Sequence, residues 1–332
     1  MLRKVALNLL LLTASILLTF ILIEVGMRLF GIISRTHNDR YFTRCPVEGL
    51  PHVTKANLCE PDYHTNSRHL RDREIPLNKP DNSFRLAIVG NSVTIGHEVA
   101  QHELFTEILE DSLNARYQQR PSIEVINAGQ ANYDINHFLP FTEYFVYPYD
   151  PDLIVYQFCW NDIAARALLR KARFPEDVGE KSFQRLLLMH SAIYLKLYRL
   201  SNTRAFGQKL VNYYKDAALM SEFYRYLWDW ERDVQSRQIR FAMMIVPLGI
   251  EVEATDRYPD LARQFIHQRG LIIAECERNG IPVINLSEPL RDHYFAHHKT
   301  LYLDQGHLNP LGHQVVANAL FHSLPLSINS NP

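Results

Sequence analysis

Arg85-Leu-Ala-Ile-Val-Gly-Asn-Ser92 is the stretch that decides the fold of this 332-residue chain. Four consecutive apolar residues followed by Gly-Asn-Ser are typical of a short buried strand that ends in a tight turn. Parallel α/β sheets bind ligands at the carboxyl ends of their strands. The sequence therefore predicts that Ser92 is exposed at such an edge.

The rest of the domain alternates between predicted strands and predicted helices. The strands are expected at 84–90, 122–128, 152–159, 239–246 and 282–286. Apolar residues at helical spacing predict helices near 102–118, 134–146 and 257–279, and a last helix that starts at Asn309-Pro310. Strands that alternate with helices of this length favour a parallel sheet covered on both faces. We expect a three-layer α/β/α flavodoxin-like sandwich.

The N-terminus is much more apolar than the rest. Val5–Ile23 is a run of about 19 mostly apolar residues, which at ~1.5 Å per residue is long enough for a hydrocarbon core of ~30 Å. No small-x-small cleavage site follows closely, so we expect an uncleaved signal anchor, a transmembrane helix within 1–27. Basic residues flank this run on both sides, and charge alone therefore does not set its orientation.

The remaining chain is predicted to form a stalk and one domain. Prolines interrupt the stalk and entry segment at 28–82, and the α/β domain is expected at 83–325. A stretch at about 163–236 exceeds what a crossover needs and contains helical segments at Phe183–Leu200 and Tyr213–Arg232. This helical insertion either buries its own apolar stripes or forms a lid or wall beside the substrate.

Composition argues against several classes of function. The net charge is −1 and no basic patch stands out, so no nucleic-acid partner is expected. No CxxC, HExxH or phosphate-loop pattern occurs, and we expect neither a metal nor an organic cofactor. The four cysteines are too few for a disulfide scaffold. In an oxidising compartment Cys45 and Cys59 could pair across the stalk, a point that the sequence leaves open, while Cys159 and Cys276 are expected to stay free.

A second informative stretch lies near the C-terminus. In Leu303-Asp-Gln-Gly-His-Leu-Asn-Pro310 an aspartate stands three residues before a histidine, which puts both side chains on one side of a turn. Asp304 can then hold the His307 imidazole in the tautomer that a general base needs. With Ser92 as the nucleophile, the three residues supply a nucleophile, a general base and an orienting acid. His313 is a rival base, but no acidic residue stands three before it and we interpret it as structural.

Two further blocks complete a family pattern. Val125-Ile-Asn-Ala-Gly129 and Leu153-Ile-Val-Tyr-Gln-Phe-Cys-Trp-Asn161-Asp162 are predicted strands that end in small or polar residues. With these blocks the chain resembles the SGNH (GDSL-like) hydrolase family over roughly residues 83–323. The match falls on Ser92, Gly129, Asn161 and His307, in the family's order. The resemblance implies an acyl-enzyme on Ser92, an oxyanion hole made by the N–H groups of Ser92 and Gly129 and the amide of Asn161, and Asp304 as the orienting acid.

One position departs from the family pattern. Its first block usually reads Gly-Asp-Ser, and here it reads Gly-Asn91-Ser. Asparagine has nearly the same shape as aspartate but is neutral and can donate as well as accept. We expect Asn91 to hold the same turn, so that Asn91→Asp changes kcat/KM by less than about tenfold, or ~1.4 kcal/mol.

The resemblance to membrane-anchored members implies a serine esterase or deacetylase that acts on the O-acyl esters of an envelope or extracellular polysaccharide. The expected partners are an acylated small-molecule or carbohydrate substrate and the lipid bilayer. The expected location is the cell membrane, with the catalytic domain outside the cytoplasm. Two alternatives stay open. One is an O-acyltransferase that uses the same acyl-enzyme, and the other is a non-catalytic SGNH-fold component that binds polysaccharide.

Overall fold

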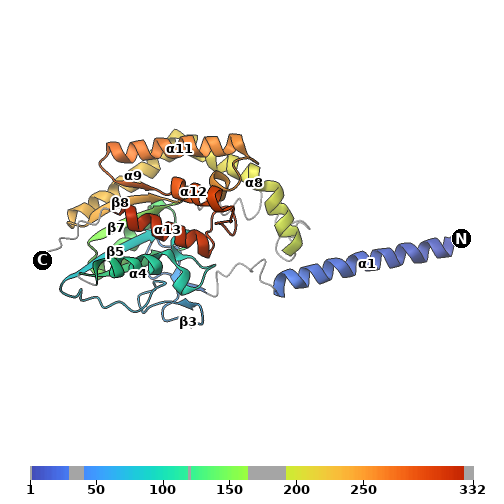
Figure 1. The fold of residues 1–332 in the computed structure, drawn as a ribbon, viewed down its shortest axis with the longest axis horizontal. Helices are drawn as coiled ribbons and strands as arrows, with labels where there is room; N and C mark the ends of the chain where they lie inside the picture. Colours follow the sequence, from blue (N-terminus) through green and yellow to red (C-terminus); the bar gives the residue numbers. More distant parts are fainter. Residues whose placement is uncertain (1, 30–40, 119–120, 164–191, 325–332) are drawn as a thin grey trace. The chain divides into compact units, whose positions relative to one another are not determined.

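The computed structural model describes residues 2–29, 41–118, 121–163 and 192–324 (Figure 1). The chain divides into two compact units. One consists of Met1–Arg40 and Arg170–Gly207, and the other of Tyr41–Leu169 and Gln208–Pro332. The predicted site residues all belong to the second unit.

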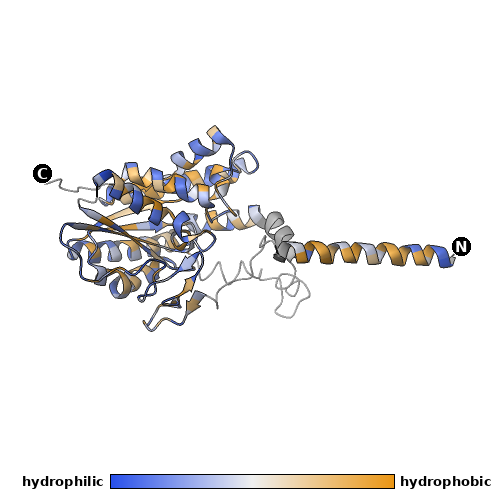
Figure 2. Ribbon diagram, turned by 60° about the horizontal axis from the view of Figure 1, so that its bottom comes forward, coloured by the Kyte–Doolittle hydropathy of each residue, from blue (hydrophilic) through white to orange (hydrophobic). Residues whose placement is uncertain are grey.

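The first unit contains α1 (Leu2–Leu29). Its segment Arg3–Gly26 is long and apolar enough to cross a membrane, and a signal sequence would have the same length and composition. Figure 2 shows that apolar residues occupy most of this helix. The predicted span Val5–Ile23 lies inside it.

The second unit is built on a five-stranded parallel sheet. Its strands are β5 (Ser83–Gly90), β6 (Ser122–Gly129), β7 (Leu153–Phe158), β8 (Arg240–Ile245) and β9 (Val283–Asn285). They lie in the order β6-β5-β7-β8-β9, which is the flavodoxin-like order. The strand order reverses between β5 and β7, and in such sheets ligands bind beyond this point. The predicted fold class is confirmed.

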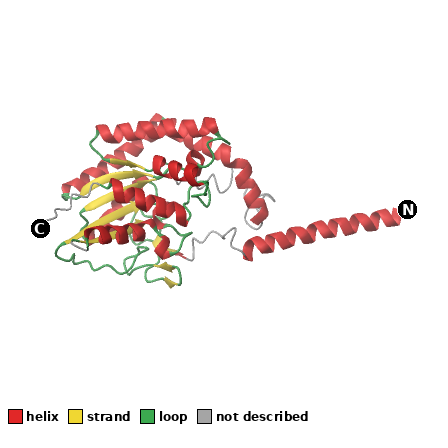
Figure 3. Cartoon of the chain, in the orientation of Figure 1, coloured by secondary structure: helices red, strands yellow, loops and turns green. Residues whose placement is uncertain are grey.

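Helices cover both faces of this sheet (Figures 1 and 3). Successive residues of β5 point to opposite faces: Ala87 and Val89 join one apolar core, while Leu86 and Ile88 join the other. The first core is closed by α5 (Ile135–Phe141), α9 (Ala217–Ser236) and α11 (Pro259–Arg278). The second is closed by α4 (Phe105–Tyr117), α12 (Ser287–His297) and α13 (Pro310–Ser323).

Shorter helices connect these elements. They are α3 (Ser92–Ile95), α10 (Gly249–Val252), the 3-10 helices η1 (Gln101–Glu103) and η3 (Tyr147–Tyr149), and the π-helical turn η2 (Thr142–Val146). The predicted helix at 134–146 is thus split into α5 and η2. Pro140 lies inside α5, where it removes a backbone donor.

The predicted helical insertion is described from residue 192 onward, as α8 (Ala192–Lys215) and α9. Residues 164–191, which include the first part of Phe183–Leu200, lie outside the described residues. The α9 helix buries an apolar stripe, and its Trp230 ring lies 5.3 Å from the Tyr156 ring of β7. This helix therefore covers the sheet between β7 and β8 as a crossover helix does.

The entry segment forms two small antiparallel hairpins. They are β1 (Phe42–Thr43) with β2 (Val53–Thr54), and β3 (Cys59–Glu60) with β4 (Tyr63–His64). The disulfide that the sequence left open between Cys45 and Cys59 is not formed. Cys45 is buried in the apolar core, whereas Cys59 is exposed on the second hairpin, and each thiol is free. Cys159 and Cys276 are also free, and both are buried.

Candidate active site

The turn after β5 places Ser92 at the first residue of α3. The Asn91 side chain caps this helix by accepting the N–H of Val93 at 3.2 Å. Gly96 ends the helix with a left-handed φ of 61°, which glycine adopts without strain. Ser92 is partly exposed although its neighbours in α3 are buried. The serine hydroxyl is therefore held at the carboxyl edge of the sheet.

Gly129, at the end of β6, makes room for α3. A Cβ at this position would lie 2.3 Å from the backbone nitrogen of Ile95. The resemblance implies an oxyanion role for this glycine, and the structure shows that the backbone of a helix lies against it. Its N–H also donates to Asn127 Oδ1 at 3.1 Å, so this predicted oxyanion donor is already bonded.

The loop before α13 brings two more predicted residues to Ser92. A β-bridge between Tyr302 and Leu308 closes this loop into a narrow hairpin. Within it, His307 Nδ1 lies 2.9 Å from Asp304 Oδ2. On the other side of the ring, His307 Nε2 lies 3.0 Å from Ser92 Oγ. The three side chains form a continuous hydrogen-bonded chain.

The hairpin is fixed by its neighbours. Oε1 of Glu253 accepts the N–H groups of Leu301 and Tyr302, the latter at 3.2 Å. The N–H of Gly249 donates to Gln305 O at 2.9 Å. No motif in the sequence pointed to Glu253, because its partners are backbone groups some 48 positions away.

Asp304 is set up to remain ionised. Partial burial raises the pKa of its carboxyl. The hydrogen bond and charge of His307 and the N–H groups of Gly306 and His307 together lower this pKa by a larger amount. The net result is a pKa well below its ordinary value. Its side chain is nevertheless 51% exposed, so solvent screens this interaction. A carboxylate in this state can orient the imidazole and stabilise its charged form.

Asn161 stands at the carboxyl end of β7, on the other side of the switch point. Its Oδ1 accepts from Asn91 Nδ2 at 2.9 Å. The adjacent Asp162 is completely buried and accepts from Asn91 Nδ2, Tyr156 Oη and the N–H of Cys159, at 2.7, 2.7 and 2.9 Å. Burial raises the pKa of Asp162 to about 8, and these three donors oppose that rise.

Arg71 fastens the far end of α3. Its buried guanidinium donates to the carbonyls of Ile95, Gly96 and Val99, the first and last at 2.8 and 2.7 Å. It also lies 4.3 Å from the centre of the Tyr63 ring. Burial lowers the pKa of Arg71 to about 10. The sequence placed Arg71 in the stalk and entry segment and did not predict this contact.

His313, the rival base considered from the sequence, lies inside the packed domain. It is buried in α13, its Nδ1 accepts the N–H of Phe105 at 3.2 Å, and its ring stacks on the Phe105 ring. Burial and the charges of Arg71 and His307 lower its pKa to about 3, so it is neutral at ordinary pH.

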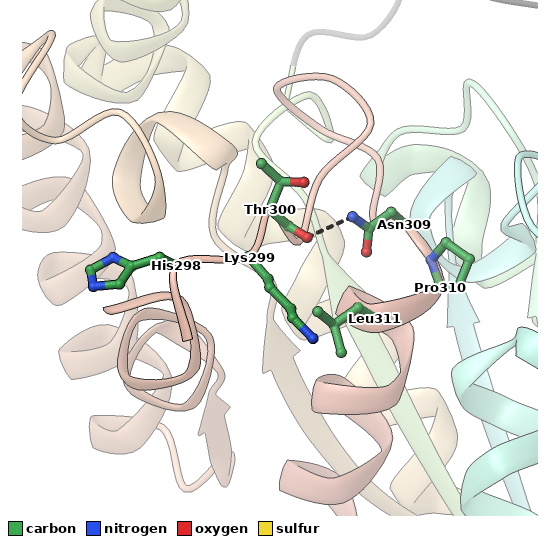
Figure 4. Close-up of a pocket in the computed structure, with 6 residues that line it drawn as sticks. All are labelled: His298, Lys299, Thr300, Asn309, Pro310 and Leu311. Carbon is green, nitrogen blue, oxygen red and sulfur yellow. Dashed lines mark hydrogen bonds between the residues drawn. The ribbon is translucent and has the colours of Figure 1, made fainter. Parts of the chain in front are cut away.

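A shallow cavity of about 570 Å³ lies beside the hairpin (Figure 4). Its lining residues are His298, Lys299, Thr300, Asn309, Pro310 and Leu311. Asn309 Nδ2 donates to Thr300 O at 2.7 Å across it. None of the five predicted site residues lines this cavity. In the described parts of the chain, no three His, Cys, Asp or Glu side chains are arranged to hold a metal.

Comparisons with known proteins found similar solved structures, several of which are described as esterases. No family model and no curated protein matches the chain. Among solved structures, it is similar to the acetyl xylan esterase AlAXEase, at 16% identity over 73% of this chain and 100% of that one, with a TM-score of 0.47.

Two further similar structures have related descriptions. A putative lipolytic protein of the G-D-S-L family from Desulfitobacterium hafniense DCB-2 has 12% identity over 72% of this chain and 99% of that one, with a TM-score of 0.44. A catalytic mutant of the acetylxylan esterase Axe2 from Geobacillus stearothermophilus has 15% identity over 72% and 93%, with a TM-score of 0.43. These proteins resemble the chain in fold.

Proposed function

We propose that the chain is a serine esterase of the SGNH type, a hydrolase that cleaves O-acyl esters. One observation carries this proposal: His307 lies between Ser92 and Asp304, with ring nitrogens 3.0 Å from the hydroxyl and 2.9 Å from the carboxylate. This is the arrangement in which a histidine takes the proton from a serine while an acid holds the ring.

The proposed reaction has two steps. With its proton on Nδ1, facing Asp304, His307 accepts the Ser92 proton on Nε2 as Oγ attacks the ester carbonyl. The charged carbonyl oxygen is stabilised by the N–H of Ser92, the first residue of α3, and by Nδ2 of Asn161. His307 then gives the proton to the departing alcohol. A water molecule repeats the sequence on the acyl-enzyme, releasing the acid and restoring Ser92.

The proposed substrate is an O-acylated carbohydrate of an envelope or extracellular polysaccharide. The side chains of His307 and Asp304 are 28% and 51% exposed, so the site is open to a large alcohol group. An open site of this kind suits an acyl group carried by a polymer. The similar structures named above include esterases described as acting on acetyl xylan.

We also propose that α1 is a single-pass anchor that holds the catalytic domain outside the cytoplasm. The length and apolar composition of Arg3–Gly26 support an anchor. Protease treatment of intact spheroplasts that carry a C-terminally tagged chain tests the orientation. Loss of the tag is expected, and a tag protected until the membrane is broken would contradict this orientation.

Hydrolysis of an aryl acetate by the detergent-solubilised full chain tests the activity. Turnover and covalent labelling by a fluorophosphonate are expected for the natural protein, and both should disappear in Ser92→Ala. Adding xylo-oligosaccharide and following the acetyl group distinguishes release to water from transfer to a sugar. A folded protein that neither turns over nor reacts with the probe would favour a non-catalytic binding component.

A further inference from the structure

We propose that Glu251 is a positioning residue whose buried carboxylate holds the two halves of the candidate site in place. One half is the segment after β7 with Trp160 and Asn161, and the other is the hairpin that carries Asp304 and His307. Glu251 acts through these neighbours and takes no part in the chemistry itself. This inference rests on the esterase function proposed above, because it assigns Glu251 a task in that reaction.

Glu251 lies in α10, the short helix after β8, and is completely buried. Its Oε1 accepts the indole N–H of Trp160 at 2.8 Å and the N–H of Leu248 at 2.9 Å. Its Oε2 accepts from the guanidinium of Arg269 on α11, which is also buried. A charge is tolerated in a protein interior where donors of this kind replace water. The carboxylate thus connects the end of β7, α10 and α11.

Trp160 holds the backbone from which Asn161, the proposed oxyanion donor, extends. The Trp160 ring packs edge-on against the rings of Tyr214 and Phe265, with ring centres 4.6 and 4.8 Å away. Its carbonyl accepts the hydroxyl of Tyr214 at 2.9 Å. This carbonyl and the N–H of Asn161 belong to one planar peptide unit. The unit is therefore fixed at its oxygen by Tyr214 and through the indole by Glu251.

The same carboxylate fixes the segment that supports the hairpin. By accepting the N–H of Leu248, Glu251 holds the start of α10. The next residue, Gly249, donates its N–H to Gln305 O at 2.9 Å. A Cβ on Gly249 would lie 3.4 Å from the carbonyl oxygen of Asp304, so the hairpin backbone lies directly against α10. A movement of α10 would therefore move the hairpin.

Loss of the Glu251 acceptor should affect the chemical step and not substrate binding. The oxyanion donor and the base act on charge that develops as Ser92 attacks, so their displacement lowers kcat more than it changes KM. A misplacement of about 1 Å can cost on the order of 10²-fold in rate. A carboxylate that only stabilised the fold would leave the kcat of the folded protein unchanged.

The bond from Trp160 is tested by Trp160→Phe, which removes the indole N–H and keeps an aromatic ring in the core. In the detergent-solubilised full chain, kcat on an aryl acetate should fall by about tenfold or more, with KM within about threefold of the natural value. Trp230→Phe is the matched control. Trp230 is completely buried in the same apolar core, and its indole nitrogen has no hydrogen-bond partner among the described residues. This variant should keep kcat and KM.

Two double variants test the carboxylate itself. Arg269 is changed in both, because a buried guanidinium without its partner would destabilise the fold. Glu251→Leu/Arg269→Leu exchanges the ion pair for an apolar pair, which buried sites often tolerate. It removes the acceptor of Trp160, so kcat should fall as in Trp160→Phe. Glu251→Gln/Arg269→Leu also lacks both charges but keeps an amide oxygen for Trp160. Its kcat should stay within about threefold of the natural value.

Circular dichroism and denaturant unfolding establish that each variant is folded before its kcat is measured. Equal kcat in the two double variants would overturn the role of the Glu251 acceptor, and so would full activity of Trp160→Phe. Equal losses in Trp160→Phe and Trp230→Phe would show that core packing, and not the bond, controls the rate. Adding Trp160→Phe to Glu251→Leu/Arg269→Leu should cost no further rate, because the bond is already absent. If the double variants do not fold, the two tryptophan variants decide.

These outcomes separate the positioning role from the proposed esterase function. If the natural chain hydrolyses the ester and Trp160→Phe keeps its kcat, the role of Glu251 is wrong and the esterase function stands. If the natural chain neither hydrolyses the ester nor reacts with a fluorophosphonate, the proposed function fails, and the task of Glu251 in the reaction fails with it.

Discussion

His307 Nε2 lies 3.0 Å from Ser92 Oγ although 215 positions separate the two residues. Ser92 follows the strand β5, which is bonded to a strand on each side, and His307 precedes α13. The helix α13 packs against α4, the next long helix after Ser92. The loop before α13, which carries His307, therefore lies next to Ser92. The contact is thus a product of the sheet order and of one helix pair.

Replacing Ser92, His307 or Asp304 should abolish most of the ester hydrolysis. Ser92→Ala is expected to lower kcat on an aryl acetate by on the order of 10⁴-fold or more, because the members of such a set act as a unit. His307→Ala should cost a similar amount and Asp304→Asn somewhat less. His298→Ala, which changes a histidine outside the set, is the control. Undiminished hydrolysis by a folded Ser92→Ala protein would show that another group is the nucleophile.

The pH dependence of the rate should not include Asp304. Hydrogen bonds within the hairpin hold the pKa of this carboxyl below its usual range, so it stays ionised above about pH 4. Lowering the pH should therefore reduce kcat/KM through a single ionisation, which we assign to His307. A profile of kcat/KM from pH 4 to 9 tests this. A slope that requires two protons on the acid side would contradict it.

His313 should matter for folding and not for chemistry. Its pKa is lowered to about 3 because it is buried, while in the unfolded chain it is near 6.5. The unfolded state thus binds more protons between these values, so His313 makes stability fall as the pH drops below about 6.5.

The substitution His313→Asn tests this role, because its amide oxygen can accept the Phe105 N–H without titrating. The acid side of the stability curve should become flatter, and kcat at pH 7.5 should stay within about tenfold of the natural value, far from the ~10⁴-fold loss expected for the triad. A loss of kcat in folded His313→Asn as large as in His307→Ala would mean that the base is wrongly assigned.

The sequence predicted the strands of the sheet but not the hydrogen bonds around the candidate site. Apolar runs bounded by turns located all five parallel strands, because β5, β6, β7 and β8 are almost entirely buried and turn residues bound the short, partly exposed β9. The helix α12 was not predicted, since only Ser287 and Leu290 are buried in it and its apolar pattern is weak. The partners of Asn91 were not predicted either. They lie 70 and 71 positions away, and local spacing says nothing about such pairs.

Gly129→Ala should disturb both stability and catalysis. Its Cβ would lie 2.3 Å from the Ile95 nitrogen, and a backbone atom can move only if α3 moves with it. Overpacking of this kind costs about 1–3 kcal/mol of unfolding free energy, and a shifted α3 displaces Ser92. Gly270→Ala is the matched control, because a Cβ there meets nothing within 4 Å. In the helix α11 it should stabilise by about 0.5–1 kcal/mol. Equal effects of the two substitutions in denaturant unfolding would refute the close approach.

Arg71→Lys should loosen the nucleophile helix without removing the charge. Arginine spreads five donors in a planar fork, and here it reaches the carbonyls of Ile95, Gly96 and Val99. Lysine has a single ammonium group and would leave some of these buried carbonyls without a donor. The loss should lower the free energy of unfolding by about 2 kcal/mol or more. Arg263→Lys, on an exposed side chain of α11, should change stability by less than about 0.5 kcal/mol. Denaturant unfolding compares the two, and similar stability would show that Arg71 does not anchor α3.

The four cysteines should differ in reactivity and none should be paired. Cys59 is exposed, whereas Cys45, Cys159 and Cys276 are buried. Burial raises the pKa of both Cys159 and Cys276 to about 12, which suppresses the reactive thiolate. Titration with a thiol reagent should detect about one thiol in the folded protein and all four in denaturant without reductant. Two missing thiols that reappear only on reduction would show that Cys45 and Cys59 are bonded after all. Such a bond would require the core around Cys45 to open, because this residue is packed among apolar side chains and its partner faces solvent.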